Sequence, residues 1–246
     1  MPESISAVFA DVHANMEALE AALADMDALS IQQRVCLGDI VGYAANPAQC
    51  VERIRGLGCP VVKGNHDAAA AEDIDLSDMR ELAQRGIEFA RRKLSTEQRA
   101  YLGRLPRTLS SEGSEFVHAS LNKPDEWHYI MREADALAHF AAQVQRLSFC
   151  GHTHVPMMWH LSNTGNIKTW SGHGRIELPA GGKTLVNVGS VGQPRDLQPA
   201  ACYAICDAQA GWIEFRRVDY DIAKARRKIL RAKLPRYAAQ RLSLGR

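Results

Sequence analysis

Residues 5–15, ISAVFADVHAN, decide the fold of this chain. The apolar run at 5–10 predicts a buried β-strand, and the polar residues Asp11 and His13 follow at its end. Asn15 then offers an N-cap, because its side-chain oxygen can accept a hydrogen bond from a free N–H of the first helical turn. The apolar residues of the predicted helix fall at i, i+3, i+7 and i+10: Met16, Leu19, Leu23 and Met26. A strand that leads straight into such a helix is typical of an α/β fold.

The same unit recurs downstream. RVCLG (34–38) predicts a second strand, and Asn46-Pro47 predicts the start of a helix that closes in the glycines of NPAQCVERIRGLG. PVVKG (60–64) predicts a third strand. Strands that alternate with helices at this spacing indicate parallel βαβ units.

The rest of the chain mixes helices and strands. Residues 77–104 predict two helices, and Ser95 and Gln98 have the spacing of a capping box that opens the second one. After Val155 the pattern changes to short β-runs separated by turn signals. The other predicted elements are a strand at 115–120, a helix at 132–143, a strand at 146–151 and one terminal helix at 219–234.

No repeat, low-complexity tract or linker divides the chain. We therefore expect one domain over residues 1–246, with two sheets packed face to face and helices outside. The 246 residues are 46% hydrophobic and 24% charged, which is ordinary for a globular protein. No signal peptide or membrane-length apolar run is visible, and the six cysteines form no CxxC pair, so we expect a cytoplasmic protein with reduced thiols and no membrane partner.

The formal charge of +2 hides an asymmetry. Residues 222–246 hold nine Lys or Arg and no Asp or Glu, which leaves an excess of seven acidic groups in residues 1–221. A basic C-terminal helix can bind nucleic acid or a membrane surface, but such a helix is more often a solvated face packed on an acidic body. Binding to nucleic acid is therefore the minor alternative.

Each predicted strand in the first 154 residues ends in a side chain that can bind a metal. The carboxyl ends of strands gather at one edge of an open α/β sheet, where ligands bind. Seven nitrogen or oxygen donors are expected to converge there: Asp11, His13, Asp39, Asn65, His118, His152 and His154. Seven donors exceed what one metal needs, but they suit two metals that share a bridging carboxylate.

The stretch CGHTHVP (150–156) places two histidines at i and i+2. In an extended segment both rings point to the same side, which indicates neutral imidazoles bound to a cation. A lone DxH or GD at a strand end would mean little, whereas five such loops in order are specific. The competing HExxH, Cys/His zinc and EF-hand patterns are absent.

These motifs, D-x-H, GD, GNHD, a strand-end His and GHxH, resemble those of the calcineurin-like metallophosphoesterase superfamily. VNVGSVGQPRD (186–196) and LPRYAAQRLSLG (234–245) are similar to segments of a subgroup of small, single-domain bacterial and archaeal members. The resemblance covers nearly the whole chain. It implies a four-layer αββα sandwich of two mixed β-sheets flanked by helices, with the site at one edge.

The resemblance also implies which residues bind which metal. Asp11, His13, Asp39 and His154 would hold one divalent ion. Asp39, Asn65, His118 and His152 would hold the other, so that Asp39 bridges the two. Mn²⁺ is the expected metal, with Fe, Ni or Zn as alternatives, because mixed His, Asp and Asn ligands suit this group better than Mg or Ca.

The expected reaction is hydrolysis of small phosphate esters, most simply as a phosphodiesterase on small or nucleotide-like substrates. Two cations lower the pKa of a bridging water, so that hydroxide is the nucleophile, and Asp39 and His66 are the predicted catalytic residues. His66 would be the general acid, oriented by Asp67, or would only position its loop. Alternatives are a phosphomonoesterase, a nuclease, or a non-catalytic regulatory module that keeps the metals.

Three residues are expected to contact the substrate. Asn65 would do so beside its metal. Arg195 could bind a phosphate oxygen, or pair with Asp196 or another carboxylate to fix its loop. Tyr43 could line the pocket or serve packing alone. The sequence predicts no oligomeric state.

Two departures from the family pattern stand out. Ala14 in DVHAN and Ala119 after His118 replace glycines that relatives carry, from which we expect altered substrate fit and no loss of metals. The segment GDIVGY lacks the Asp and Arg of the GDxxDRG motif in Ser/Thr protein phosphatases. A protein phosphatase is therefore a poor match.

Overall fold

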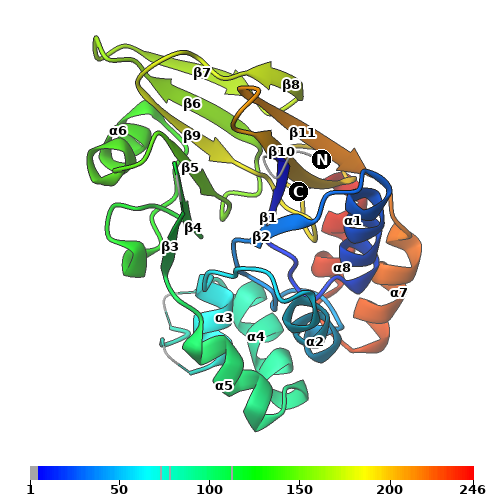
Figure 1. The fold of residues 1–246 in the computed structure, drawn as a ribbon. Coiled ribbons are helices and arrows are strands. Elements are labelled where there is room, and N and C mark those ends of the chain that lie inside the picture. The colour runs from blue at the N-terminus through cyan, green and yellow to red at the C-terminus, as the bar shows by residue number, and fades with distance from the viewer. Residues whose placement is uncertain (1–4, 73, 78, 112) are drawn as a thin grey trace.

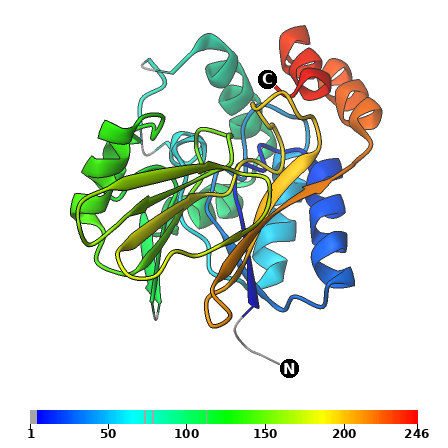
Figure 2. The same cartoon turned by 90° about the horizontal axis from the view of Figure 1, so that it is seen from above.

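The computed structural model describes residues 5–72, 74–77, 79–111 and 113–246. The chain folds into two mixed β-sheets that pack face to face, with helices on their outer faces (Figures 1 and 2). This confirms the predicted fold class. Among the described residues, no helix has the length and apolar character needed to cross a bilayer. All six cysteine thiols are free.

The first sheet has five strands in the order β2-β1-β10-β11-β8. β1 and β2 are parallel, and the other neighbours are antiparallel. The strands are β1 (Ile5–Phe9), β2 (Gln33–Cys36), β8 (Gly174–Glu177), β10 (Ala201–Asp207) and β11 (Trp212–Val218).

The second sheet has six strands in the order β3-β4-β5-β9-β6-β7. β4, β5 and β9 are parallel, so that their carboxyl ends meet at one edge, and the remaining pairs are antiparallel. The strands are β3 (Thr108–Ser111), β4 (Ser114–Val117), β5 (Leu147–Cys150), β6 (Met157–Leu161), β7 (Ile167–Ser171) and β9 (Lys183–Asn187).

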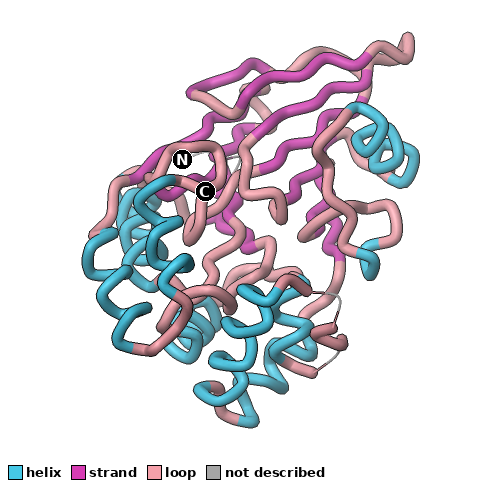
Figure 3. The backbone as a smooth tube through the Cα atoms, turned by 180° about the vertical axis from the view of Figure 1, so that it is seen from behind, coloured by secondary structure: helices cyan, strands magenta, loops and turns pink. Residues whose placement is uncertain are grey.

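The helices cover both outer faces. α1 (Met16–Ala28) and α2 (Pro47–Leu57) pack on the first sheet, and α6 (Glu133–Ala142) packs on the second. Helices α3 (Asn65–Ala70), α4 (Glu81–Lys93) and α5 (Thr96–Arg104) lie together at one end of the molecule. Seen from behind, loops gather between these helices and the strands (Figure 3).

Strand periodicity builds the layers. On β1, Ala7 and Phe9 face the helices, whereas Val8 and the following Ala10 face the second sheet. Phe149 of β5 meets Val8 in the core between the sheets. Alternate side chains on an inner strand therefore serve two separate cores, because successive residues point to opposite faces.

The caps follow the sequence with one exception. Asn15 accepts a hydrogen bond from the Ala18 N–H, and Ser95 and Gln98 form the predicted capping box. Asn46 stands at the N-cap of α2 but makes no capping bond. Its Oδ1 accepts a hydrogen bond from Lys228 Nζ at 3.0 Å.

Two predicted elements differ in the structure. Residues 60–64 form only an isolated parallel bridge, between Cys36 and Val61, because the Lys63 N–H turns away to donate to the Pro106 carbonyl. The single terminal helix is in fact two, α7 (Ile222–Arg231) and α8 (Arg236–Leu244). Lys233 adopts a left-handed φ of 58° between them, and Pro235 then stands at the N-cap of α8.

Of the two C-terminal helices, orange and red in Figures 1 and 2, α7 packs against α1 and α8 packs against α7. Lys224 and Lys228 both pair with Glu17 of α1, the first at 3.5 Å. Part of the basic tail is thus engaged with the acidic body of the protein, as the solvated-face interpretation expects.

Candidate metal centre

The predicted donors meet at the carboxyl ends of β1, β2, β4 and β5. Short loops carry them, and the loops are tied to one another by main-chain bonds: the His13 N–H donates to the Asp39 carbonyl at 2.9 Å, and the Gly151 N–H donates to the His118 carbonyl at 2.9 Å. Asn65, the first residue of α3, is half-buried. The other six donors are at most 6% exposed: Asp11, His13, Asp39, His118, His152 and His154.

Asp11, His13 and His154 form one donor group whose ligand atoms all lie within 4.8 Å of one another. Asp11 Oδ1 is 3.3 Å from His154 Nε2 and 3.7 Å from His13 Nε2. One carboxylate oxygen and two imidazole nitrogens thus face a common point.

Asp39, His118 and His152 form a second such group. Asp39 Oδ2 lies 3.4 Å from His118 Nε2, and His118 Nε2 lies 3.1 Å from His152 Nδ1. The same Asp39 oxygen is 3.6 Å from His13 Nε2 of the first group. Asp39 therefore stands between the two groups, where a bridging carboxylate would be.

The hydrogen bonds of the histidines test whether this donor set fits a cation. Nδ1 of His13 is bonded to the Val41 carbonyl at 3.2 Å, and Nδ1 of His154 to the Gln193 carbonyl at 2.6 Å. A carbonyl only accepts, so each Nδ1 carries the proton and each Nε2 presents a bare lone pair. Yet the two Nε2 atoms lie 3.0 Å apart.

Two facing lone pairs repel unless a cation lies beside them, and orienting carbonyls of this kind are usual behind metal-bound histidines. Asp11 Oδ1 and Asn65 Oδ1 are buried and have no hydrogen-bond partner among the described residues. Buried polar atoms are seldom left unpaired. The residues therefore fit divalent cations with nitrogen and oxygen ligands.

The protonation of the cluster agrees with this fit. Burial lowers the pKa of His13, His152 and His154, which keeps these imidazoles neutral. At His118 burial also disfavours the charge, but the carboxylates of Asp39 and Asp11 outweigh it and raise the pKa to about 9. A proton and a metal cation would compete for Nε2 of His118, the nitrogen that faces Asp39.

Left-handed backbone conformations bring the donors together. Positive φ angles, which cost about 1–2 kcal/mol in residues other than glycine, concentrate here. They occur at Asp11, His13, Asp39, His152 and His154. The expectation of an extended segment around the two histidines of CGHTHVP is therefore wrong: φ is 67° at His152 and 62° at His154, and their rings face His118 and His13 respectively.

Gly42 is a site residue that the sequence interpretation missed. It has a φ of 138°, and a Cβ there would lie 2.6 Å from His13 Nδ1 and 2.7 Å from His66 Nδ1. Only glycine leaves room for the two rings. The sequence signal that could have identified Gly42 as a site residue is its position in GDIVGY, three residues after Asp39.

His66 is 4% exposed, and its ring packs edge-on against His13 with centroids 4.7 Å apart. Its Nδ1 has no partner among the described residues. Asp67 does not orient it: the Asp67 carboxylate accepts hydrogen bonds from the N–H groups of Ile40 and Gly64, at 2.9 and 3.2 Å. Asp67 therefore joins the two loops that follow β2 and precede α3.

Tyr43 and Arg195 lie at the edge of the cluster. The Tyr43 ring lies 4.7 Å from that of His13. Arg195 donates to Gln193 Oε1 at 3.1 Å and to Tyr43 Oη at 3.4 Å. Asp196 pairs with Arg217, and no Asp or Glu among the described residues pairs with Arg195, so the alternative ion pair is not formed.

Two aromatic residues form a wall that the sequence interpretation also missed. Both follow the short 3₁₀ helix η1 (Pro124–Glu126). Tyr129, half-exposed, stacks on His152 with centroids 4.1 Å apart, and Trp127 lies edge-on to His118 at 5.9 Å. No local pattern in the sequence marks this contact.

The segment 186–196 supports the donor loops. Asn187 Nδ2 donates to the Gly151 carbonyl at 2.7 Å, and Ser190 Oγ donates to the Asp11 carbonyl at 2.9 Å. These bonds fix the loops after β5 and β1, which carry donors of both groups. The segment therefore has a structural role, because its hydrogen bonds hold the donor loops in place.

Ala14 has the left-handed φ of 59° that favours glycine. Its methyl group belongs to the buried cluster that holds Phe89 and Ile229 beneath the C-terminal helices. The strain is thereby offset by packing. The expected effect of Ala14 on substrate fit remains a prediction.

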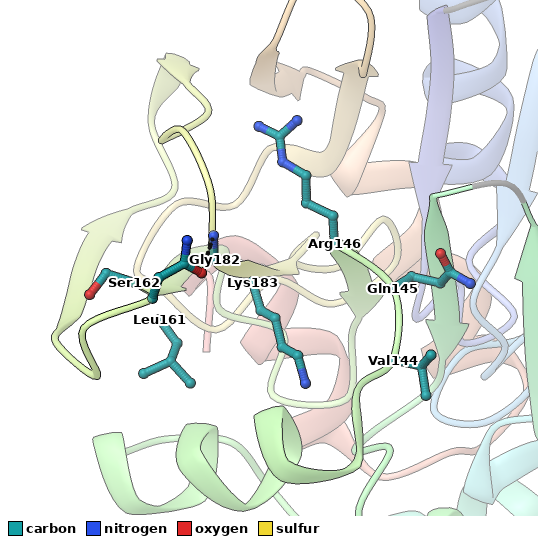
Figure 4. A pocket seen from close by; sticks show the side chains of 8 residues that line it. Val144, Gln145, Arg146, Leu161, Ser162, Gly182 and Lys183 are labelled. Carbon is teal, nitrogen blue, oxygen red and sulfur yellow. Dashed lines mark hydrogen bonds between the residues drawn. The ribbon is translucent and has the colours of Figure 1, made fainter.

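A surface hollow of about 380 Å³ lies elsewhere (Figure 4). Arg146 and Lys183 line it at the amino ends of β5 and β9, opposite to the donor cluster. Lys183 Nζ is engaged by the Phe140 carbonyl at 3.0 Å. This hollow is separate from the candidate centre.

Comparison with known proteins places the chain in a family. Residues 6–211 match the calcineurin-like phosphoesterase superfamily domain. An uncharacterized protein of Methanocaldococcus jannaschii is 38% identical over 251 residues, with both chains covered completely. A metallophosphoesterase from Sphaerobacter thermophilus is 35% identical, with a TM-score of 0.86 over 98% of this chain and 99% of that one. A hypothetical protein from Pyrococcus horikoshii shares the fold, with a TM-score of 0.82 at 22% identity over 98% of each chain.

The matched residues 6–211 include every donor of the cluster. The clustered His and Asp side chains are those that a divalent metal binds. The chain therefore belongs to the calcineurin-like phosphoesterase superfamily and is a metal-dependent phosphoesterase.

Proposed function

We propose that this protein is a dinuclear phosphodiesterase that hydrolyses small, nucleotide-like phosphate esters. The observation that carries the proposal is the position of Asp39, whose Oδ2 lies within 3.6 Å of a histidine nitrogen in each donor group. One carboxylate shared by two donor groups supports two cations rather than one.

Asp11, His13, Asp39 and His154 would hold the first cation, and Asp39, Asn65, His118 and His152 the second. Mn²⁺ is the proposed metal, with Fe, Ni or Zn as alternatives, because the ligands mix nitrogen and oxygen. Two such cations would neutralise the charge of a phosphate ester and lower the pKa of a bound water.

His66 would donate a proton to the leaving oxygen. Burial lowers the pKa of His66 to about 4, although the charge of Asp39 opposes this shift. The negative charge that develops on the leaving oxygen as its bond to phosphorus breaks would raise the pKa again, because a nearby negative charge favours the imidazolium. General acid catalysis of this kind contributes about 10²–10⁴-fold in rate.

The aromatic wall supports nucleotide-like substrates. Tyr129 is 50% exposed while it stacks on His152. An exposed tyrosine ring can stack on a nucleobase, which contributes about 1–3 kcal/mol per base. Asn65, Arg195 and Tyr43 would contact the phosphate and its substituent.

The proposal can be tested by metal reconstitution. Protein stripped of metal would receive Mn²⁺ and be assayed with bis(p-nitrophenyl) phosphate and with p-nitrophenyl phosphate. We expect faster turnover of the diester, whereas a strong preference for the monoester would identify a phosphomonoesterase. Turnover of neither, with metal bound, would favour a regulatory module.

A matched pair of variants tests the bridging role. Asp39→Asn should reduce hydrolysis to the metal-free background, because a neutral amide bridges two cations poorly. Asp27→Asn makes the same change at a residue that is 62% exposed and pairs with Arg34, so it should keep full activity. Full activity in Asp39→Asn would contradict the two-metal proposal.

A further inference from the structure

Two arginines from distant parts of the chain flank one tyrosine at the edge of the cluster. Arg195 follows β9 in sequence, and Arg241 is on α8. The guanidinium carbon of each lies 5.8 Å from the centroid of the Tyr43 ring. The centroid of that ring also lies 4.7 Å from the centroid of the His13 ring and 4.8 Å from that of the His66 ring. The arginines therefore lie one aromatic ring away from the candidate metal centre.

Among the residues that the structure describes, neither guanidinium pairs with an Asp or Glu side chain. The adjacent carboxylate, Asp196, is taken by Arg217. Arg195 Nε is buried and has no hydrogen-bond partner in the described part of the chain. Arg241 Nε donates to the main-chain oxygen of Arg246, and its two Nη groups bond to no described residue. Several N–H groups of the two guanidiniums therefore have no acceptor among the described residues.

The two charges also act on each other. Burial lowers the pKa of Arg241, and the charge of Arg195 lowers it further. Arg80, just before α4, adds a third positive charge that acts on Arg241 in the same direction. Arginine stays protonated all the same, so the repulsion persists in the folded protein. An anion that bridges the guanidiniums would relieve it.

Contacts within the fold use only part of the Arg241 guanidinium. Its guanidinium also lies over the Tyr237 ring at 5.7 Å, and the bond to Arg246 anchors the end of α8. These contacts use Nε and the face of the group. The planar edge that binds phosphate bidentately remains available.

We propose that Arg195 and Arg241 form a second anion subsite, and that the preferred substrates carry a second phosphate group besides the one that is cleaved. This inference rests on the proposed function, which places the cleaved phosphate at the donor cluster. It gives α8, the second of the two C-terminal helices, a part in substrate choice.

Binding to the Mn²⁺-loaded protein tests the subsite without any need for turnover. Isothermal titration calorimetry would compare a nucleoside 5′-monophosphate with its 5′-diphosphate, 5′-triphosphate and 3′,5′-bisphosphate. At least one ligand with an additional phosphate should bind roughly 10- to 100-fold more tightly than the monophosphate. The absence of any such gain would overturn the inference.

Variants test whether the two arginines cause the gain in affinity from the additional phosphate. Arg241→Gln should remove most of it. Arg236→Gln makes the same charge change at an exposed residue of the same helix and should retain it. An equal gain in both variants would overturn the inference. If Arg241→Gln does not fold, Arg241→Lys serves instead: it should lose part of the gain because an ammonium lacks the planar fork, and an undiminished gain would count against the subsite.

Assays of bis(p-nitrophenyl) phosphate on the same preparations separate the two proposals. Suppose that Arg241 is needed for the tighter binding of ligands with an additional phosphate, but that wild-type protein shows no Mn²⁺-dependent hydrolysis. This result would contradict the proposed function and leave the subsite supported. Hydrolysis without an Arg241-dependent gain would contradict the subsite alone.

Discussion

His13 Nε2 and His154 Nε2 face each other at 3.0 Å, although the two residues are 141 positions apart in the chain. Main-chain carbonyls hold the other nitrogen of each ring, at Val41 and Gln193, so that neither imidazole can turn away. The fold therefore keeps two lone pairs in opposition. A cation bound beside them would turn this repulsion into attraction.

Cation binding should therefore stabilise the fold. Mn²⁺ at about 100 times its dissociation constant would add about 2.7 kcal/mol to the free energy of unfolding, measured by thermal denaturation with and without chelator. His154→Ala should lose most of this increment. His128→Ala, at an exposed histidine that pairs with Glu126, should keep it. An equal increment in both variants would argue against His154 as a ligand.

Gly42→Ala should destabilise the protein and lower its activity, because the new methyl would press on His13 and His66 at 2.6–2.7 Å in a backbone conformation that favours glycine. Gly56→Ala is the matched control. Gly56 lies inside α2, where a Cβ meets nothing within 4 Å, so alanine should stabilise the protein by about 1 kcal/mol. Urea unfolding and diester hydrolysis measure both effects, and a neutral result for Gly42→Ala would refute the packing described.

Asp67→Ala should cost about 3 kcal/mol or more. Its buried carboxylate accepts hydrogen bonds from Ile40 and Gly64, and each buried N–H left unpaired costs about 1–3 kcal/mol. Asp219→Ala removes an exposed carboxylate that bonds to no described residue, and it should change the free energy of unfolding by at most about 0.5 kcal/mol. Equal effects in chemical denaturation would show that Asp67 does not join the two loops.

His139 should make stability fall with decreasing pH. Burial lowers its pKa from 6.5 to about 3, and its Nδ1 accepts a hydrogen bond from the Leu121 N–H at 3.1 Å. Below pH 6.5 the unfolded chain gains a proton at this residue and the folded protein does not, so stability is lost progressively down to about pH 3.

His139→Gln removes this titration. The free energy of unfolding of the wild type should therefore fall more steeply than that of the variant, by up to about 1.4 kcal/mol per pH unit. Urea unfolding at pH 7, 6 and 5, with chelator present throughout, measures the two slopes. Parallel slopes would mean that His139 titrates normally in the folded protein.

Local rules predicted much of the fold. The cap at Asn15 and the capping box at Ser95 involve residues only three positions apart, so short spacing suffices to see them. The positions of Asp11, Asp39 and His118 after strands also follow from chain order. A sheet gathers such ends at one edge whatever the details of the loops.

Features that depend on distant contacts could not be predicted in this way. The left-handed φ at His152 and His154 is held by bonds that reach Asp11 and Gln193 in other loops. The stacking of Tyr129 on His152 and the position of Arg241 over Tyr43 likewise depend on packing between separate elements. Periodicity carries no information on such contacts.

The most direct test of the account is a titration of metal-stripped protein with Mn²⁺, in which bound metal per chain and hydrolysis of bis(p-nitrophenyl) phosphate are followed together. We predict that two ions bind per chain and that hydrolysis appears as the second site fills. Full hydrolysis with one ion per chain, or hydrolysis by the metal-free protein, would contradict the account.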